Sequence, residues 1–316
     1  MSELIPPSET SEPIPIRTGT LTAEDQKEAV VRLGSARGGW WRQVGWRHLI
    51  AWVALFFGLF PILFLISAAI NPLGTLSTST LIPKGASLEN FSKLFATTEY
   101  LNWYWNTMVI ALIAGTLSMF ISACAAYAYS RFRRGQAPRA AQPAPDPDVP
   151  QFLAIVTLYL MFTTITDYYP RIGFNTPWSL IILYLGGALG VNTWLMKGFL
   201  DTIPKDLDES ARVDGATHAQ IFFGIILPLI TPILAVTGLL GFIGYVNEFL
   251  IANVFLTDPA SKTLAVGLFG LVAGERNNNF GVFAAGAVLA AIPTMVLFQI
   301  LQRFIVGGLT TGAVKG

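Results

Sequence analysis

The chain has 316 residues, of which 53% are hydrophobic and only 12% are charged, and its formal net charge is +1. Soluble proteins of this size carry about twice that share of charged residues, so most of the chain is expected to lie in lipid. The small net charge argues against nucleic-acid binding. The single cysteine, Cys124, excludes an intrachain disulfide, and two histidines far apart in the sequence, His48 and His218, favour no metal site.

The N-terminal region, residues 1–47, precedes the first apolar run. Residues 1–21 are rich in Pro, Ser and Thr, which is typical of disordered segments. Thr22 opens a capping box that predicts a short amphipathic helix, and Gly34 is a suitable end for it. We therefore assign 1–47 to a cytoplasmic N-terminal tail.

Six apolar runs follow, and each predicts one helix that crosses the bilayer, which takes about 20 residues. They span 48–70, 107–130, 150–166, 178–200, 229–256 and 282–304. The third run is short for a full crossing. The pattern predicts an all-α, polytopic membrane protein with six transmembrane helices, a transmembrane domain at 48–304 and a C-terminal tail at 305–316.

Basic residues are shared unevenly between the two sides of the six predicted spans. Fifteen of the 20 Lys and Arg fall in the tails and in or next to the loops after the second and fourth spans. Because cytoplasmic loops are enriched in Lys and Arg, both termini and the loop after the fourth span are expected in the cytoplasm.

Two loops and one polar pair are notable on the other side of the membrane. Residues 88–95 have an amphipathic helical pattern, and the loop 257–281 is too apolar for a plain connector. That loop is expected to fold against its own helices, which the sequence favours, or against a second protein. Asn247 and Glu248 lie near the outer end of the predicted fifth span. An acid there either lines a transport pathway or joins helices by a hydrogen bond.

Catalytic motifs are absent from the sequence. It contains no G-x-x-x-x-G-K-[ST] phosphate-binding loop, no G-x-S-x-G and no H-E-x-x-H. The chain is therefore expected to be a non-catalytic membrane subunit that does not hydrolyse ATP itself. A secondary transporter that works alone is an alternative, although such proteins usually carry several ionisable groups within their spans.

A polar insert at about 204–227 separates the fourth and fifth spans. Pro204 and the three acids within 206–209 suit the start of a helix, where negative charge meets the positive end of the helix dipole. Gly215 predicts a turn that ends this helix, because glycine readily adopts a positive φ. Thr217 is a suitable cap for a second short helix. The insert is predicted to form a rigid two-helix knob on the cytoplasmic side.

The knob resembles the E-A-A-x-x-D-G-A…F-x-x-I-x-L-P-x-x-x-P signature of permease subunits in binding-protein-dependent ABC importers. The residues that carry this resemblance are Glu209, Ser210, Ala211, Asp214, Gly215, Ala216, Phe222, Ile225, Leu227, Pro228 and Pro232. Ser210 is the one departure, since the family usually has Ala there. The resemblance implies a type I importer permease fold whose coupling helices sit in a groove of a cytoplasmic ATPase. Glu209 would be a contact and Gly215 a hinge.

Further segments, such as T-L-A-V-G-L and the ending Q-R-F-I-V-G-G-L-T-T-G-A-V-K-G, are similar to the maltose/maltodextrin branch of this family over about 48–316. The resemblance implies that the C-terminal tail reaches between two ATPase subunits, with contacts at Thr310, Gly312 and Lys315. It also implies that the outer loop enters the sugar cleft of a solute-binding protein. The residues expected to face that protein are Ala273, Gly274, Glu275, Arg276 and Asn277.

The function that the resemblance implies is import of maltose/maltodextrin-type oligosaccharides across a bacterial or archaeal cytoplasmic membrane. The implied partners are membrane lipid, a second homologous permease, a homodimeric ABC ATPase that holds ATP and Mg, and an extracytoplasmic solute-binding protein. This chain itself would bind no cofactor, and the other permease would make most sugar contacts. Another cargo, such as trehalose, a different oligosaccharide or glycerol phosphate, stays open.

Residues 135–149, G-Q-A-P-R-A-A-Q-P-A-P-D-P-D-V, depart from the family pattern, which has a leucine-rich start of the third span here. When the codons that could encode this segment are read with the frame shifted by one base, they permit Leu at several positions. The shifted reading also permits the family pattern directly before Pro150. The segment is therefore either a real flexible cytoplasmic linker or the product of two compensating frameshifts, which resequencing would distinguish.

Overall fold

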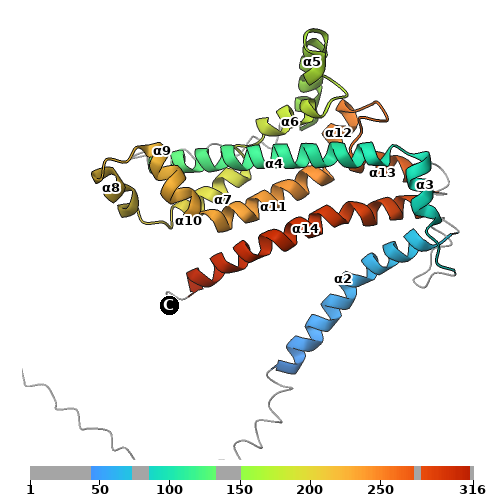
Figure 1. Ribbon diagram of the computed structural model, residues 1–316, viewed down its shortest axis with the longest axis horizontal. Coiled ribbons are helices and arrows are strands. Elements are labelled where there is room, and N and C mark those ends of the chain that lie inside the picture. Colours follow the sequence, from blue (N-terminus) through green and yellow to red (C-terminus); the bar gives the residue numbers. More distant parts are fainter. Residues whose placement is uncertain (1–43, 73–84, 133–150, 274–278, 314–316) are drawn as a thin grey trace, which may run out of the picture. The chain divides into compact units, whose positions relative to one another are not determined.

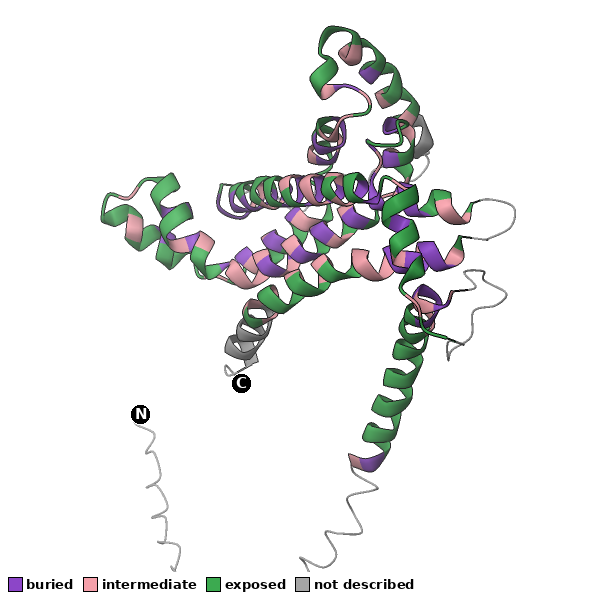
Figure 2. Ribbon diagram, turned by 45° about the vertical axis from the view of Figure 1, so that its right-hand side comes forward, coloured by how far each residue is buried: buried purple, intermediate pink, exposed green. Residues whose placement is uncertain are grey.

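All regular structure is helical in residues 44–72, 85–132, 151–273 and 279–313, the part of the chain that the computed structural model describes (Figure 1). For residues 151–153 and 305–313 only the backbone is described. The chain divides into two units, Met1–Pro61 and Ile62–Gly316. The described part of the first unit is mainly the start of helix α2 (Trp46–Ile70), whose apolar side chains are exposed along most of its length (Figure 2).

The second unit contains the end of α2 and the remaining helices. In chain order these are α3 (Glu89–Thr97), α4 (Tyr100–Arg131), α5 (Gln151–Tyr168), η4 (Pro170–Ile172), α6 (Pro177–Gly186), α7 (Val191–Leu200), α8 (Asp206–Val213), α9 (His218–Ile221), η5 (Phe222–Ile226), α10 (Leu227–Leu229), α11 (Thr231–Asn247), α12 (Leu250–Phe255), α13 (Leu264–Val272) and α14 (Phe280–Ala313). Helix α4 is central, because α6, α7, α11 and α13 all pack against it, and α14 lies along α11 (Figure 1).

The predicted all-α membrane fold is confirmed, but the count of six spans is not: the described residues contain three helices long and apolar enough to cross a membrane, or up to five spans if each of two bent pairs is one span. Among the described residues, α2, α4 and the part of α14 over 280–304 are long and apolar enough to cross a bilayer. The two bent pairs are α6 with α7, at 51°, and residues 218–229 with 231–247, at 77°; each is either a broken span or a re-entrant loop. The apolar part of α5, Ala154–Tyr168, is shorter than a full span.

Two predicted spans are interrupted rather than continuous. The run 178–200 breaks between α6 and α7, where Gly186, Gly187 and Gly190 follow one another closely and glycine disfavours helix. The run 229–256 breaks between α11 and α12 at Glu248, whose backbone is extended. The second predicted span also begins earlier, at Tyr100 rather than at 107, because the first turns of α4 are buried against α13 and α14.

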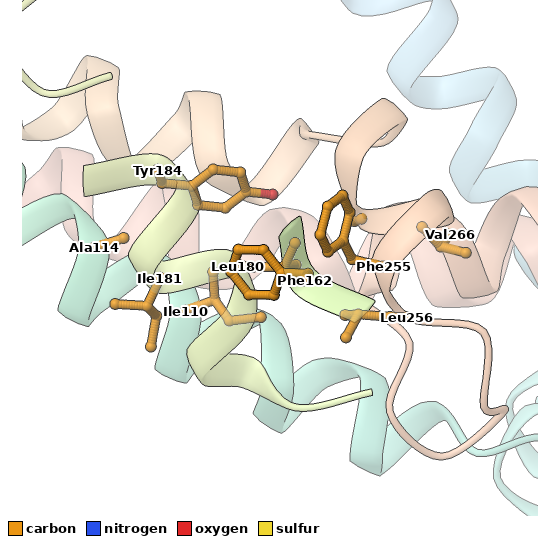
Figure 3. Packing of buried hydrophobic residues seen from close by; sticks show 10 residues of the cluster. Ile110, Ala114, Phe162, Leu180, Ile181, Tyr184, Phe255, Leu256 and Val266 are labelled. Atoms are coloured by element: carbon orange, nitrogen blue, oxygen red, sulfur yellow. The ribbon is translucent and has the colours of Figure 1, made fainter. Parts of the chain in front are cut away.

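The largest buried apolar cluster joins α4, α5, α6 and α12 (Figure 3). The ring of Phe162 in α5 meets the ring of Phe255 in α12 edge-on, with 5.2 Å between the ring centroids. Leu180 and Ile181 of α6 complete this contact against Ile110 of α4. The cluster explains how the short α5 is held, since its side chain Phe162 is fully buried there.

A second cluster lies at the end of the unit opposite the knob and includes the predicted apolar loop 257–281. Its segment 264–272 is helix α13, which packs on α4 and α14. Leu264 and Leu268 are buried against Trp103 of α4, whose indole Nε1 donates a hydrogen bond to the carbonyl oxygen of Pro259 at 2.7 Å. The expectation that this loop folds against its own helices is confirmed for these described residues.

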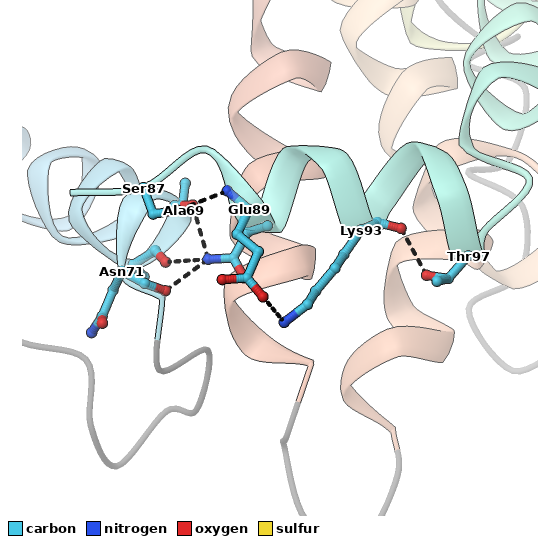
Figure 4. Close-up of polar contacts among 8 residues, drawn as sticks. Ala69, Asn71, Ser87, Glu89, Lys93 and Thr97 are labelled. Carbon is cyan, nitrogen blue, oxygen red and sulfur yellow. Dashed lines mark hydrogen bonds and ion pairs between the residues drawn. The ribbon is translucent and has the colours of Figure 1, made fainter. Parts of the chain in front are cut away.

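The amphipathic pattern at 88–95 also forms the predicted helix, α3, which is tied to the end of α2. The side-chain amide of Asn90 is buried and donates to the carbonyl oxygens of Ala69 at 3.0 Å and Asn71 at 2.8 Å. On the exposed side of α3, Lys93 pairs with Glu89 at 2.7 Å (Figure 4). Asn90 therefore supplies donors for carbonyl groups at the end of α2 that have no partner within the helix.

Replacing Asn90 by Asp is expected to destabilise the protein more than replacing it by Ala. Alanine removes the donor and leaves buried carbonyls unpaired, at a cost of about 1–3 kcal/mol. Aspartate adds repulsion between its carboxylate and the same carbonyl oxygens. Thermal unfolding of the purified protein measures the order of the two variants. Equal melting temperatures for Asn90→Asp, Asn90→Ala and the unaltered chain would contradict this role.

Candidate functional site

Helix α8 has one face that packs on the protein and one that is open. Its first turn carries three acids, as predicted, which suits the positive end of the helix dipole. One of them, Asp208, is buried, and Ala211, one turn later, is half-buried. Glu209 and Ser210 lie on the exposed side. This division separates side chains that anchor α8 from side chains that a partner can reach.

The turn after α8 is built around Gly215, as the sequence predicts. Its φ is +84°, in the left-handed region that glycine adopts without steric cost. The amide of Gly215 donates to the carbonyl oxygen of Arg212 at 3.0 Å, and the amide of Ala216 donates to that of Ala211 at 2.9 Å. These two bonds form a Schellman motif, which satisfies the last carbonyl groups of α8 and reverses the chain sharply.

The second helix of the knob starts at the predicted cap. The Thr217 hydroxyl accepts from the amide of Gln220 at 3.3 Å, and the Gln220 side chain accepts from the amide of Thr217 at 2.8 Å. This capping box fixes the start of α9. The following apolar face, Ile221 and Phe222, is buried against Tyr127 of α4 and residues of α7. The knob is therefore anchored on the spans rather than loosely attached.

Nine of the eleven residues that carry the family resemblance, all except Ile225 and Pro232, are the ones predicted to couple the knob to an ATPase, and they occupy three kinds of position. Those exposed are Glu209, Ser210, Asp214, Gly215 and Pro228; those partly buried are Ala211, Ala216 and Leu227; and Phe222 is buried. The exposed set defines what we call the knob surface, which is available to another protein. The other four residues hold the knob together and attach it to the bundle, so their contribution to a partner contact is indirect.

Sequence reasoning missed a buried ion pair beneath the knob. Arg131, the last residue of α4, pairs through its Nε with the Asp208 carboxylate, and both side chains are almost fully buried, at 2% and 1% exposure. Arg131 also donates to the carbonyl oxygen of Leu200 at 3.4 Å and to that of Ile203 at 3.2 Å. The sequence does show a basic residue, Arg131, at the end of a long apolar run. It does not show which of the acids at 206–209 would pair with it.

A more exposed charge cluster lies beside this pair at the end of α7. Lys197 contacts the Asp201 carboxylate at 2.5 Å, and the Ser130 hydroxyl donates to the same carboxylate at 2.7 Å. Burial raises the pKa of Asp201, but the hydrogen bonds from Lys197 and Ser130 outweigh it and hold the pKa below its ordinary value. Asp201 therefore stays charged at neutral pH and links α7 to the end of α4.

Most of the residues predicted to contact the binding protein or the ATPase through the C-terminal tail lie outside the described residues or have only a described backbone. Ala273 is exposed at the end of α13, whereas Gly274, Glu275, Arg276 and Asn277 lie outside the described residues. Thr310 and Gly312 lie on the backbone of the last turns of α14, without described side chains, and Lys315 lies outside the described residues. The predicted N-terminal helix and the segment 135–149 also lie outside them. These assignments stay predictions.

The predicted pathway pair lies at the break between α11 and α12. The Glu248 carboxylate accepts from the amides of Ile251 at 2.7 Å and Ala252 at 3.0 Å, and from the Tyr184 hydroxyl at 2.6 Å. It thus caps α12 and joins it to α6, which favours the helix-joining alternative. Asn247 is exposed and lines a cavity of about 600 Å³ between α11, α13 and α14. A pathway role stays a prediction for both.

The fold, with its interrupted spans and anchored polar knob, is that of an ABC importer permease. A solved bacterial ABC transporter involved in the import of the acidic polysaccharide alginate matches with a TM-score of 0.60 at 19% identity, over 90% of this chain and 99% of that one. A family model described as binding-protein-dependent transport system inner membrane component matches residues 148–310. The chain belongs to this family of membrane transport proteins.

Relatives extend the similarity beyond the matched range. The galactooligosaccharides transport system permease protein GanQ of Bacillus subtilis is 40% identical over 85% of this chain and 94% of its own length. The maltose/maltodextrin transport system permease protein MalG of Yersinia pestis is 36% identical over 94% of this chain and 100% of its own. The maltodextrin permease MdxG of Bacillus subtilis is 40% identical over 73% and 81%.

Proposed function

We propose that the chain is a permease subunit of an ATP-driven importer that carries maltose/maltodextrin-type oligosaccharides across the cytoplasmic membrane. The observation that carries this proposal is the knob surface, which presents Glu209 and Gly215 on a rigid turn anchored to α4. An exposed polar knob with buried attachments is suited to receive a push from a soluble protein. The sugar class is supported by relatives along nearly the whole chain whose names refer to oligosaccharides.

The mechanism follows from how the knob is attached. A homodimeric cytoplasmic ATPase binds ATP and Mg and closes, and the knob surface moves with it. Because α8 and α9 are packed against α4 and α7, their displacement reorients the spans between inward and outward access. The chain's own residues provide the contact and the lever. The free energy comes from hydrolysis in the ATPase, and no catalytic group is needed here.

The remaining partners are a second homologous permease and an external solute-binding protein. A solved relative of this fold is a bacterial alginate ABC transporter in complex with a pentasaccharide-bound periplasmic protein, which matches with a TM-score of 0.54 at 17% identity. We place both termini in the cytoplasm from the distribution of basic residues. The segment after α13, which begins at Ala273, then lies on the side where the binding protein docks.

The test is uptake into proteoliposomes that contain this chain, its partner permease and the ATPase, with the binding protein outside. We expect labelled maltodextrin to accumulate only when ATP and all of these proteins are present. Glu209→Ala removes an exposed charge of the knob surface and should lower ATP-driven uptake about tenfold, as the loss of one charged hydrogen bond does. Asp206→Ala, an exposed acid in the same turn, serves as the matched control.

Other outcomes identify the alternatives. Accumulation of sugar by the chain alone, driven by an ion gradient, would establish a secondary transporter and contradict the proposal. Uptake of galactooligosaccharide, trehalose or glycerol phosphate in place of maltodextrin would keep the importer class and change the cargo. Normal uptake by the Glu209→Ala variant would remove this residue from the ATPase contact.

A further inference from the structure

The Arg131–Asp208 ion pair connects four segments of the chain at one buried point. Its charged groups come from the end of α4 and the first turn of α8. The same guanidinium donates to the Leu200 carbonyl at the end of α7 and to the Ile203 carbonyl in the turn between α7 and α8. It also contacts the Ser130 hydroxyl at 3.2 Å.

The burial of this pair is hard to explain by stability alone. Removing two charges from water costs several kcal/mol for each ion, and well-packed apolar side chains at such sites are often as stable or more so. Hydrophobic contact around Phe222 already attaches the second helix of the knob. What the ion pair adds is position, because one guanidinium faces the Asp208 carboxylate of α8 through Nε and donates through its terminal nitrogens to the carbonyl oxygens of Leu200 and Ile203.

Much of the remaining surface of α8 is open. Ser210 is exposed, and Val213 at the end of the helix is 88% exposed. Ala211 contributes only a half-buried methyl group. Without the ion pair, α8 would lose its buried charged contact with the end of α4, and the two helices could shift relative to each other.

We propose that Arg131 and Asp208 are positioning residues that make α8 move as one body with α4, so that displacement of the knob surface reaches the spans. This inference rests on the proposed function, which supplies the partner that moves α8. It goes beyond that function because it assigns the transmission of movement from the knob to the spans to two buried residues, which a partner protein does not touch. Breaking the pair should separate ATP hydrolysis from transport rather than abolish the ATPase contact.

The experiment uses the full reconstituted complex and three variants. Asp208→Asn breaks the pair. Arg131→Met combined with Asp208→Leu removes both charges and leaves no unpaired buried ion, so folded complex is retained even where the single variant misfolds. Asp206→Asn removes an exposed acid of the same turn and is the matched control. The first readout is sugar transported per ATP hydrolysed, which a loss of folded protein alone does not change.

The second readout is a distance within the chain. A spin label on the exposed native Cys124 of α4 and another on Val213→Cys in α8 report whether the two helices move together. In the unaltered chain and in Asp206→Asn we expect one narrow distance distribution, the same with and without ATP. Asp208→Asn and the double variant should broaden it, and transport per ATP should fall roughly 5- to 100-fold, the range of typical coupling free energies.

The outcomes separate the two proposals. If the double variant keeps the narrow distribution and the transport per ATP of the unaltered complex, the ion pair is not the link. If the unaltered complex shows no ATP-dependent transport, the proposed function fails. The label distances in the same chain then still decide whether the pair fixes α8 to α4.

Discussion

Gly215→Val is expected to lower ATP-driven uptake about tenfold without removing the protein from the membrane. The φ of +84° at this position is open to glycine and strongly unfavourable for a β-branched residue. The Schellman bonds of Gly215 and Ala216 hold the end of α8, so strain at 215 displaces the whole knob surface. Uptake per folded protein in proteoliposomes measures the effect.

The control for this substitution lies in the same knob. Gly224 has an ordinary φ, and a Cβ built on it meets no atom within 4 Å, which is also true of Gly215. The two positions therefore differ in backbone conformation rather than in available space. Gly224→Val should leave uptake largely unchanged, and Gly215→Asn should be milder than Gly215→Val, because Asn tolerates the left-handed region. Similar losses at 215 and 224 would refute the conformational explanation.

Gly267→Ala is expected to destabilise the protein by about 3 kcal/mol, the upper end of the usual cost of overpacking, and to lower its melting temperature by about 5–10 °C. A Cβ at this position would lie 2.3 Å from carbon atoms of the Trp103 ring. The ring cannot move aside easily, because it is buried and its indole donates to the Pro259 carbonyl. Thermal unfolding of the purified protein measures the change.

A matched glycine stands one turn later on the same helix. Gly270 is exposed, and a Cβ there meets nothing within 4 Å. Gly270→Ala should therefore stabilise α13 slightly, by the roughly 0.5–1 kcal/mol that alanine gains over glycine in a helix. Trp103→Leu should offset part of the loss in Gly267→Ala, so that the double variant is less destabilised than the sum of the singles. Equal melting temperatures for the two alanine variants would rule out the clash.

Features that depend on a few consecutive residues were predictable. The left-handed turn at Gly215 and the capping box at Thr217 involve hydrogen bonds between residues only a few positions apart. The local sequence is therefore enough to predict them. The helix at 88–95 and the apolar contact of the loop after α12 follow from hydrophobic patterning. The same local pattern carried the family resemblance, which is why membership could be expected from one short stretch.

Other features were not predictable because hydropathy records length and polarity but not direction. The 51° bend between α6 and α7 required knowledge of how Gly186 to Gly190 pack, although the glycines themselves were visible. The sequence shows that Glu248 is an unusual acid within an apolar run. It does not show its hydrogen bonds, because Tyr184 lies in a distant helix and the bond from Ile251 requires the break between α11 and α12.

By itself, the sequence determined that this protein is a bundle of membrane-crossing helices with a polar two-helix knob, because apolar run length and turn chemistry act locally. Only the tertiary structure decided which knob residues face outward and which attach it. Asp208 and Glu209 are adjacent acids in the same turn, yet one is buried against Arg131 and the other is exposed. The difference arises because a buried charge needs a partner of opposite sign, and chain folding alone brings α4 and α8 together.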